Sequence, residues 1–438
     1  MSFRLRVLTF LIAGVAAGAE NPPAASTPDP AFSKVPFDQW LTEGGAARFQ
    51  WTARVTGGDL DRFQRLRARV EIQVDGRELA KRKGRGGLVF FVQFSDSDHR
   101  RYQTHAVIPL QDVAEAASKS NFVYAQDALV VPGDYRVDVA VLDTGNGEHA
   151  ALQQTLHVAP LRNDPLPDSW NGLPPVEFIA AADPPDAWFQ PQLEGRLHLP
   201  LETRRPVRVE VLLNASPSAG GPRFHSSRVT SQGLRDLLPA VKAISQMDLS
   251  QGTLNVSVVD LTHQQVLLAQ NRVGPRAQPL DWPRLRTALG QADPNKVDVR
   301  DLANRQQNPQ FFVDEVRRRV TAEADPGGIA LVVLSGPMEF NSGEDLRRIE
   351  LEEKPRGKVF YIRYHPFLPQ PVIAGPQYPN RPNRRFGYPQ GPVALAAMEP
   401  ADGLAPLLKP LQPRVFDVYK PEQFRRALAD VMREIARM

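Results

Sequence analysis

The sequence predicts a multidomain protein in which a β-rich half precedes an α/β half with a mostly parallel, doubly wound sheet. Three observations support this prediction. The 438 residues are more than one hydrophobic core usually organises. Residues 49–160 read as short strands separated by turn residues, whereas strands alternate with helices from about residue 205. The 41 prolines favour short strands, loops and linkers over long helices.

The N-terminus predicts export. Arg4 and Arg6 precede an apolar run from Val7 to Ala17, and small residues continue to Ala19, which is the pattern of a secretory signal over residues 1–19. A membrane anchor is the alternative, but the apolar run is shorter than the about 20 residues that cross a bilayer. We therefore expect cleavage near Ala19, a periplasmic or extracellular location, and no transmembrane segment after signal cleavage.

Composition narrows the possible partners and chemistry. Removal of Arg4 and Arg6 with the signal lowers the 53 basic residues to 51, against 49 acidic ones, and this near-neutral balance argues against nucleic-acid binding. The absence of cysteine excludes disulfides, thiolate metal sites and cysteine nucleophiles. Hydrophobic residues make up 42% of the chain and charged residues 23%, as in ordinary globular proteins. Stability must therefore come from apolar cores.

The first half predicts a spacer and a β-sandwich. Residues 20–45 are small, polar and proline-rich, which is typical of a flexible spacer. Within residues 46–160, a strand at 135–142 places alternate apolar residues on one face, and a partner strand returns after the turn Asn146-Gly147. This hairpin is similar to those that close immunoglobulin and fibronectin type III domains. The resemblance implies an all-β immunoglobulin/fibronectin III-like sandwich.

Residues 161–204 predict a proline-rich connector between the two domains. Trp170, Phe178, Trp188 and Phe189 make this segment more aromatic than a solvated tether. We therefore expect it to lie against a neighbouring domain.

Residues 205–438 predict an α/β domain. The opening strand carries the apolar run Val209 to Leu213 and leads into the polar triad Asn214-x-Ser216-x-Ser218. Ligand sites in open parallel sheets lie at the carboxyl ends of strands, where this triad is expected. The predicted strands are residues 205–213, 254–260, 265–269, 329–334, 358–364 and 414–419, and the predicted helices are residues 232–249, 282–289, 311–320 and 421–438.

The order of these elements resembles a von Willebrand factor A domain of the kind found in exported bacterial proteins. The resemblance includes the closing strand at Arg414-Val415-Phe416 and the helix that begins at Pro421. In that family the first strand ends in Asp-x-Ser-x-Ser, and these residues bind a divalent cation together with a threonine and an aspartate from two later loops. The cation receives an acidic group of a partner.

This chain departs from the family pattern at each of the three loops. Asn214 replaces the first aspartate, although Ser216 and Ser218 remain. No threonine lies between residues 291 and 319, where only Asp298 and Asp301 are possible substitutes. Gly336 stands where the third loop would supply an aspartate. Magnesium prefers carboxylates and calcium needs several oxygens, so the resemblance implies a degenerate metal site, and we expect neither Mg²⁺ nor Ca²⁺ nor another cofactor.

Two other interpretations of the triad remain open. Asparagine and serine side chains bond readily to nearby backbone, so Asn214 and Ser216 are also typical of a simple turn. Alternatively, the same sheet edge forms a contact surface that uses no metal. A catalytic site is not predicted, because the eight histidines are scattered and neither His-Glu-x-x-His nor Gly-x-Ser-x-Gly occurs.

The insert at residues 367–392 is the most unusual surface segment of the sequence. Its prolines favour extended backbone, and its aromatic and arginine content is typical of interface anchors. We interpret it as a docking arm for a protein partner, with a decorative loop as the alternative. The anchor residues of this arm are Tyr378, Arg381, Arg384, Arg385, Phe386 and Tyr388.

The basic run from Lys81 to Gly87 is the second candidate surface, and it predicts either a solvated hairpin loop or a contact for anionic polysaccharide or lipid. Taken together, these patterns predict an exported, non-catalytic protein-binding or scaffolding protein. A metal-dependent adhesion protein and an exported hydrolase are the alternatives.

Overall fold

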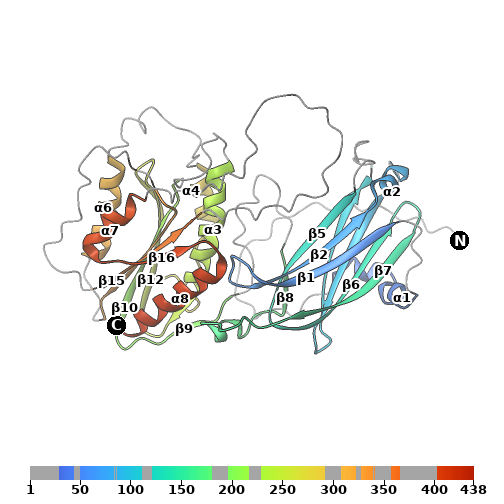
Figure 1. The fold of residues 1–438 in the computed structure, drawn as a ribbon, viewed down its shortest axis with the longest axis horizontal. Helices are drawn as coiled ribbons and strands as arrows, with labels where there is room; N and C mark the ends of the chain where they lie inside the picture. Colours follow the sequence, from blue (N-terminus) through green and yellow to red (C-terminus); the bar gives the residue numbers. More distant parts are fainter. Residues whose placement is uncertain are drawn as a thin grey trace, which may run out of the picture.

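The protein is rich in β-strand and has two units that lie side by side along its long axis (Figure 1). In the described residues, the first unit holds two four-stranded sheets, and the second holds a six-stranded sheet with a two-stranded ribbon beside it. The expected multidomain, β-rich organisation is therefore present. The computed structural model describes residues 29–43, 50–82, 84, 86–110, 121–179, 196–216, 228–291, 307–321, 327–338, 340, 357–365 and 402–438.

Two antiparallel sheets pack face to face in the first unit, in the orders β1-β2-β5-β8 and β4-β3-β6-β7. Alternate residues of the strands point into one shared core, in which Val70, Phe90 and Val139 are fully buried. The strands are β1 (Trp51–Leu60), β2 (Leu66–Val74), β3 (Gly87–Ser95), β4 (Arg101–Pro109), β5 (Phe122–Val130), β6 (Gly133–Asp143), β7 (His149–Val158) and β8 (Val176–Phe178).

A short N-terminal segment covers the outer face of the second sheet. The 3-10 helix η1 (Phe32–Lys34) and the helix α1 (Phe37–Glu43) place Phe32, Phe37 and Trp40 against Phe91 of β3. The ring centroids of these three residues lie 5.0, 6.1 and 6.2 Å from that of Phe91. Because β3 is covered on both faces, all its residues are buried. The prediction of a flexible spacer over residues 20–45 is therefore wrong for residues 29–43.

The proline-rich connector packs against both units. Its strand β8 pairs antiparallel with β5, so the first unit continues beyond the predicted boundary at residue 160. Trp170, on the 3-10 helix η4 (Pro167–Trp170), packs against the core of each unit. The strand β9 (Leu199–Leu201) pairs with β11 (Met247–Leu249) of the second unit. The described connector therefore lies against its neighbours, as its aromatic content predicts.

The second unit contains a six-stranded sheet in the order β13-β12-β10-β14-β15-β16, in which only the β12–β13 pair is antiparallel. Numbered along the chain within this sheet, the order is 3-2-1-4-5-6, which is a doubly wound topology. Apolar runs buried on both faces form the central strands. The strands are β10 (Val207–Asn214), β12 (Gly252–Asp260), β13 (Gln265–Gln270), β14 (Ile329–Ser335), β15 (Gly357–Tyr364) and β16 (Arg414–Val418).

Helices cover both faces of this sheet. Helices α3, α4 and α8 bury their apolar residues with alternate residues of β10 such as Val209 and Val211. Helices α6 and α7 pack on the other face, against Leu212 of β10 and Leu331 of β14. The helices are α2 (Gly76–Lys81) in the first unit, and α3 (Arg228–Ile244), α4 (Trp282–Gln291), α6 (Asn308–Val320), α7 (Leu404–Leu408) and α8 (Pro421–Ala436), with the 3-10 helix η7 (Lys409–Leu411), in the second.

Candidate functional site

The strand order places one candidate site at the carboxyl edge of the six-stranded sheet. In a doubly wound sheet, ligands bind where the strand order reverses, which here lies between β10 and β14. Asn214 ends β10 and Ser335 ends β14, and the Asn214 Nδ2 donates a hydrogen bond of 2.9 Å to the Ser335 Oγ. We define the switch-point cluster as Asn214, Ser216, Asp260, His263, Ser335 and Met338.

The hydrogen bonds of Asn214 fix the direction of its amide. The backbone N–H of Ser216 can only donate, and it lies 3.0 Å from the Asn214 Oδ1. The other amide atom is therefore the Nδ2, which faces the Ser335 Oγ and lies 2.8 Å from the Met338 Sδ. Asn214 is 1% exposed and Ser335 is 0% exposed. An amide donor, the Asn214 Nδ2, therefore lies where the strand order reverses, and the Met338 thioether packs against it.

Ser216 and Asp260 form the other half of the switch-point cluster. The Ser216 Oγ accepts the Leu261 N–H at 2.6 Å and donates to the Asp260 Oδ1 at 3.2 Å. The same Oδ1 accepts the backbone N–H groups of Thr262 and His263, and the His263 Nδ1 lies 2.5 Å from the Oδ2. These bonds hold the turn between β12 and β13 against the end of β10.

The structure brings together only part of the predicted triad. Asn214 and Ser216 lie in the switch-point cluster, and Gly336 follows Ser335, whose Oγ donates to the Gly336 carbonyl at 2.6 Å. Ser218 lies outside the described residues, as do Asp298 and Asp301. The signal sequence at residues 1–19 and the six anchors of the docking arm at residues 367–392 also lie outside them.

The sequence did not identify Asp260, His263 and Met338 as site residues. The register explains how Asp260 reaches the site, because Asn214 pairs with Val259 in the parallel β10–β12 ladder. Asp260 is therefore the first residue beyond that pair, at the same edge of the sheet. The sequence did contain a signal for Asp260, because this acidic residue ends the strand predicted at residues 254–260.

The donor set of the switch-point cluster does not fit a magnesium or calcium ion. Both cations need several oxygen ligands, and magnesium in particular sheds its water reluctantly. Here the Oγ atoms of Ser216 and Ser335 each already accept one hydrogen bond and donate another. The Nδ2 of Asn214 carries hydrogens rather than a lone pair for a cation. Among the described residues, no group of three or more His, Asp and Glu side chains is placed to hold a metal.

The same residues do not form a nucleophile relay. In a Ser-His-Asp triad the imidazole lies between the hydroxyl and the carboxylate and takes the hydroxyl proton. Here the carboxylate of Asp260 lies between the Ser216 Oγ and the His263 Nδ1. Ser216 is also only 7% exposed. The arrangement stabilises the turn between β12 and β13 and does not activate the Ser216 hydroxyl as a nucleophile.

A second polar group lies farther along the carboxyl edge, where β15 and β16 end. Arg363 binds both Asp402 and Asp417, at 3.0 and 2.7 Å, and the His365 Nε2 lies 2.8 Å from the same Asp417 carboxylate. The rings of His365 and Tyr419 stack at 4.1 Å, and Tyr419 is 42% exposed. We call these five residues the edge corner. Its aromatic surface lies beside the ion pairs of Arg363 with Asp402 and Asp417.

The hydrogen bonds of the edge corner keep Asp417 and Arg363 ionised near neutral pH. Burial opposes the charge on Asp417, but the hydrogen bonds from Arg363 and His365 outweigh it and hold the pKa of Asp417 below its ordinary value. The hydrogen bond to Asp417 raises the pKa of Arg363 above its ordinary value. The ion pair between Arg363 and Asp417 is therefore maintained at neutral pH.

The basic run from Lys81 to Gly87 is partly used by the fold. Lys81 ends α2, a short helix whose Asp75 cap accepts a hydrogen bond from the Arg77 N–H. Arg82 binds Glu78, Asp143 and Glu148 at 2.7, 3.0 and 2.9 Å, and its side chain is only 14% exposed. Arg82 therefore fastens α2 to the β6–β7 hairpin and is not part of a free cationic surface.

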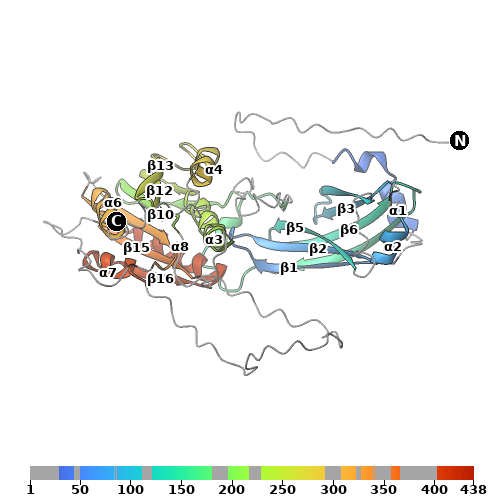
Figure 2. The same ribbon diagram turned by 90° about the horizontal axis from the view of Figure 1, so that it is seen from above.

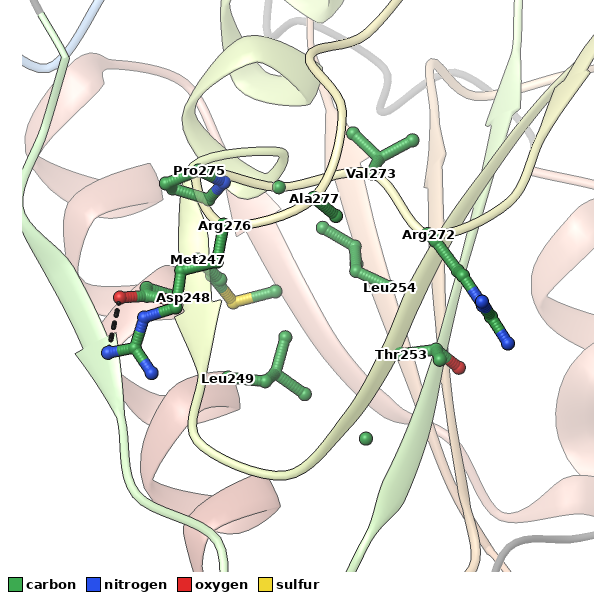
Figure 3. Close-up of a pocket in the computed structure, with 12 residues that line it drawn as sticks. Met247, Asp248, Leu249, Thr253, Leu254, Arg272, Val273, Pro275, Arg276 and Ala277 are labelled. Atoms are coloured by element: carbon green, nitrogen blue, oxygen red, sulfur yellow. Dashed lines mark ion pairs between the residues drawn. The ribbon is translucent and has the colours of Figure 1, made fainter.

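A pocket of about 390 Å³ lies at the opposite edge of the sheet, beside the start of β12 (Figure 3). Met247, Leu254 and Val273 form its buried floor. At its rim Arg276 forms an ion pair of 2.9 Å with Asp248. Arg272 also lines the pocket, so its lining carries two guanidinium groups and one carboxylate.

Among the described residues, no helix has the length and apolar character needed to span a bilayer. No family model and no curated protein matches the chain.

Solved structures that are similar to parts of the chain include the following three. The putative ApaA protein from Bordetella pertussis has 14% identity and a TM-score of 0.17, and the match covers 26% of this chain and 97% of that one. A glycosyl hydrolase family 2 member from Bacteroides cellulosilyticus has 10% identity and a TM-score of 0.17, with 64% and 36% covered. A Bacteroides uniformis beta-glucuronidase has 8% identity and a TM-score of 0.18, with 64% and 33% covered. TM-scores this low support no assignment of fold or activity.

Proposed function

We propose that this chain is an exported, non-catalytic binding or scaffolding protein. Its second unit is a von Willebrand factor A-like domain that recognises a protein partner without a metal, and its first unit is an immunoglobulin/fibronectin III-like sandwich. The doubly wound strand order, the antiparallel edge strand β13 and the polar residues that end β10 support the family assignment. The signal pattern at residues 1–19 supports export.

The orientation of the Asn214 amide is the observation that carries this proposal. The family uses the corresponding position to bring a negative charge to a cation. Here the Nδ2 donates to Ser335 and lies against Met338, while the Oδ1 is held by the Ser216 N–H. A partner's acidic group therefore has no cation to meet, and recognition falls to the exposed surface of the carboxyl edge. The edge corner, with Tyr419 exposed, is the part of that surface best suited to contact.

The two alternative functions have less support. A metal-dependent adhesion protein needs oxygen ligands that the switch-point cluster has already committed to internal hydrogen bonds. An exported hydrolase needs an activated nucleophile, and Asp260 separates Ser216 from His263. These two observations favour the binding function over both alternatives.

Metal titration tests the proposal directly. We expect no saturable heat when MgCl₂ or CaCl₂ is titrated into the chelator-treated full chain by isothermal calorimetry, because water solvates either ion better than the committed oxygens do. Capture of a partner from the native envelope fraction should be equal with Mg²⁺ and with EDTA. Micromolar affinity for either ion that Ser216→Ala abolishes would overturn the proposal in favour of metal-dependent adhesion.

Deletion of residues 377–390 tests the docking arm. The arm's flanking residues His365 and Asp402 are both tied to Arg363 or Asp417 in the edge corner, so the fold fixes both ends of the segment. Shortening the segment between them from 36 to 22 residues changes the closure free energy by about 0.4 kcal/mol. We expect an unchanged melting temperature and a several-fold loss of partner capture.

A matched variant separates the loss of the anchors from the loss of length. Replacement of Arg381, Arg384 and Arg385 by serine removes three anchors and keeps the full length of the segment. It should weaken capture as the deletion does. A folded deletion variant with undiminished capture would remove the docking-arm hypothesis and leave the edge corner as the contact surface.

A further inference from the structure

The pocket beside the start of β12 lies away from the surfaces that the proposed function uses. Strands β12 and β13 lie on the opposite side of the sheet from β15 and β16, whose carboxyl ends carry the edge corner (Figure 2). The pocket also lies at the amino edge, because Gly252, Thr253 and Leu254, the first residues of β12, line it. We call it the amino-edge pocket. A ligand bound there would be separate from a partner at the carboxyl edge.

The floor of the amino-edge pocket is apolar. Met247, Leu254 and Val273 are buried and belong to the main core of the second unit. Leu249 packs against the same core and is only partly buried, so it continues the apolar surface toward solvent. The volume of about 390 Å³ is within the range of small-molecule sites, roughly 300–1,000 Å³. A hydrocarbon group that enters this pocket would exchange water for apolar neighbours.

Hydrogen bonds hold the walls of the pocket in place. One wall is β11, which is fixed by its parallel pairing with β9. Another is the turn that follows β13, in which the Val273 N–H donates to the Leu254 carbonyl at 2.8 Å. In the same turn the Gly274 N–H donates to the Gln278 carbonyl at 3.0 Å. The pocket is therefore formed before a ligand arrives, and binding does not have to order a loop.

The charged side chains that line the pocket leave one positive charge. Arg272 and Arg276 carry two guanidinium groups, and Asp248 carries the carboxylate. Arg276 lies with Asp248 on one side of the apolar floor (Figure 3). Arg272 lies beside Thr253, on the other side. A monoanion would therefore bring the lining to neutrality, whereas a cation would meet a surplus of positive charge.

Arg276 is the guanidinium best placed to receive this anion. Its ion pair joins the Arg276 Nη2 to the Asp248 Oδ2 at 2.9 Å. A guanidinium has five N–H donors in a planar fork, so this contact leaves donors for a second carboxylate. The Arg276 side chain is 68% exposed, so a ligand can reach it from solvent. Asp248 would then hold the guanidinium between two carboxylates.

We propose that the amino-edge pocket binds a small monocarboxylate with an apolar chain, such as a medium-chain fatty acid. The hydrocarbon chain lies on the floor formed by Met247, Leu254 and Val273, and the carboxylate accepts hydrogen bonds from Arg276. Inorganic phosphate or sulfate would leave the floor uncovered, and a neutral hydrocarbon would leave the positive charge unbalanced. The floor and the rim together therefore favour a ligand that is both apolar and anionic.

Isothermal calorimetry of the full chain with sodium octanoate tests this site, at concentrations below those at which octanoate forms micelles. We expect saturable binding of one molecule per chain. Octan-1-ol keeps the hydrocarbon chain and lacks the charge, so it should bind roughly tenfold more weakly. Sodium acetate keeps the charge and lacks the chain, so it should show no saturable binding. The proposal is overturned if octanoate does not saturate the native chain, or if octan-1-ol binds as tightly.

Variants of the lining separate this pocket from any other site. Arg276→Ser should weaken octanoate binding roughly tenfold and leave octan-1-ol binding unchanged, because only the carboxylate contacts the guanidinium. Arg433→Ser is the matched control, because it removes an arginine from an exposed ion pair on α8, and it should bind both compounds as the native chain does. Ala277→Trp, at an exposed lining residue, should block the pocket and abolish the binding of both. Undiminished octanoate affinity in folded Arg276→Ser or folded Ala277→Trp would place the ligand elsewhere and refute the assignment.

Discussion

Arg425→Met is expected to lower the free energy of unfolding by about 3–5 kcal/mol, because it leaves the carboxylate of Asp164 buried without its cation. Arg425 is 1% exposed and donates to both Asp164 oxygens, at 2.6 and 2.7 Å. It also donates to Ser169 and to the Leu166 carbonyl, and its guanidinium lies 4.5 Å from the ring centroid of Trp170. One side chain on α8 thus fastens residues 164–170 of the connector.

Urea unfolding followed by tryptophan fluorescence measures this effect, because Trp170 lies beside the substituted residue. Arg433→Met, on the same helix but 54% exposed, should change the free energy by less than about 0.5 kcal/mol. Adding Asp164→Asn to Arg425→Met should recover part of the loss, since no buried charge then remains. Equal effects of Arg425→Met and Arg433→Met would show that the connector does not depend on this ion pair.

The pH dependence of the pair gives an independent check. Burial opposes the charge on Asp164, but the hydrogen bond from Arg425 outweighs it and holds the pKa of Asp164 below its ordinary value. Because the pKa of Asp164 is lowered, the ion pair contributes fully to the stability of the native chain at any pH above the ordinary pKa of an aspartate. This contribution is lost only as the pH falls below that pKa. In Arg425→Met the hydrogen bond that lowers the pKa of Asp164 is lost while burial, which raises it, remains, so protonation of the carboxyl group should make the penalty smaller at pH 5 than at pH 8.

The sequence predicted the longer strands because each carries a strong local pattern, but it missed the three-residue strands β8 and β9 in the connector and β11, which fell inside the helix predicted at residues 232–249. Apolar runs indicated β10 and β14, and alternation indicated β6. It did not predict α1 or α7, for a physical reason. Helix α1 has seven residues and gains its stability by packing on Phe91, while α7 has five residues with a proline inside. Neither helix has a periodic pattern long enough to be read without its tertiary contacts.

The sequence likewise predicted only part of the candidate site. Asn214 and Ser216 follow directly from the end of an apolar strand, and the sequence identified both. Asp260 and His263 lie more than forty residues farther along the chain, and only the parallel register of β10 with β12 brings them to Ser216. The sequence also gave no direction for the Asn214 amide, because the Ser216 N–H and Met338 that fix it meet only in the fold.

Gly252→Ala is expected to lower the free energy of unfolding by about 3–5 kcal/mol, and thermal or urea unfolding followed by circular dichroism measures it. Gly252 starts β12 with a φ of +116°, a backbone conformation that alanine rarely adopts. An added Cβ would also collide with the carbonyl oxygen of Val207, the residue that pairs with Gly252 at the start of β10. Relief of this contact requires the two central strands to separate at the amino edge.

Gly290→Ala is the matched control, because the same substitution there should have the opposite sign. Gly290 lies in α4, and an added Cβ meets no atom within 4 Å. Alanine in this position should stabilise the protein by about 0.5–1 kcal/mol, since it restricts the unfolded chain without a cost in the helix. If both variants change stability alike, the close approach of β10 and β12 is not what makes glycine necessary at position 252. Opposite signs would tie that requirement to the parallel pairing that also brings Asp260 to Ser216.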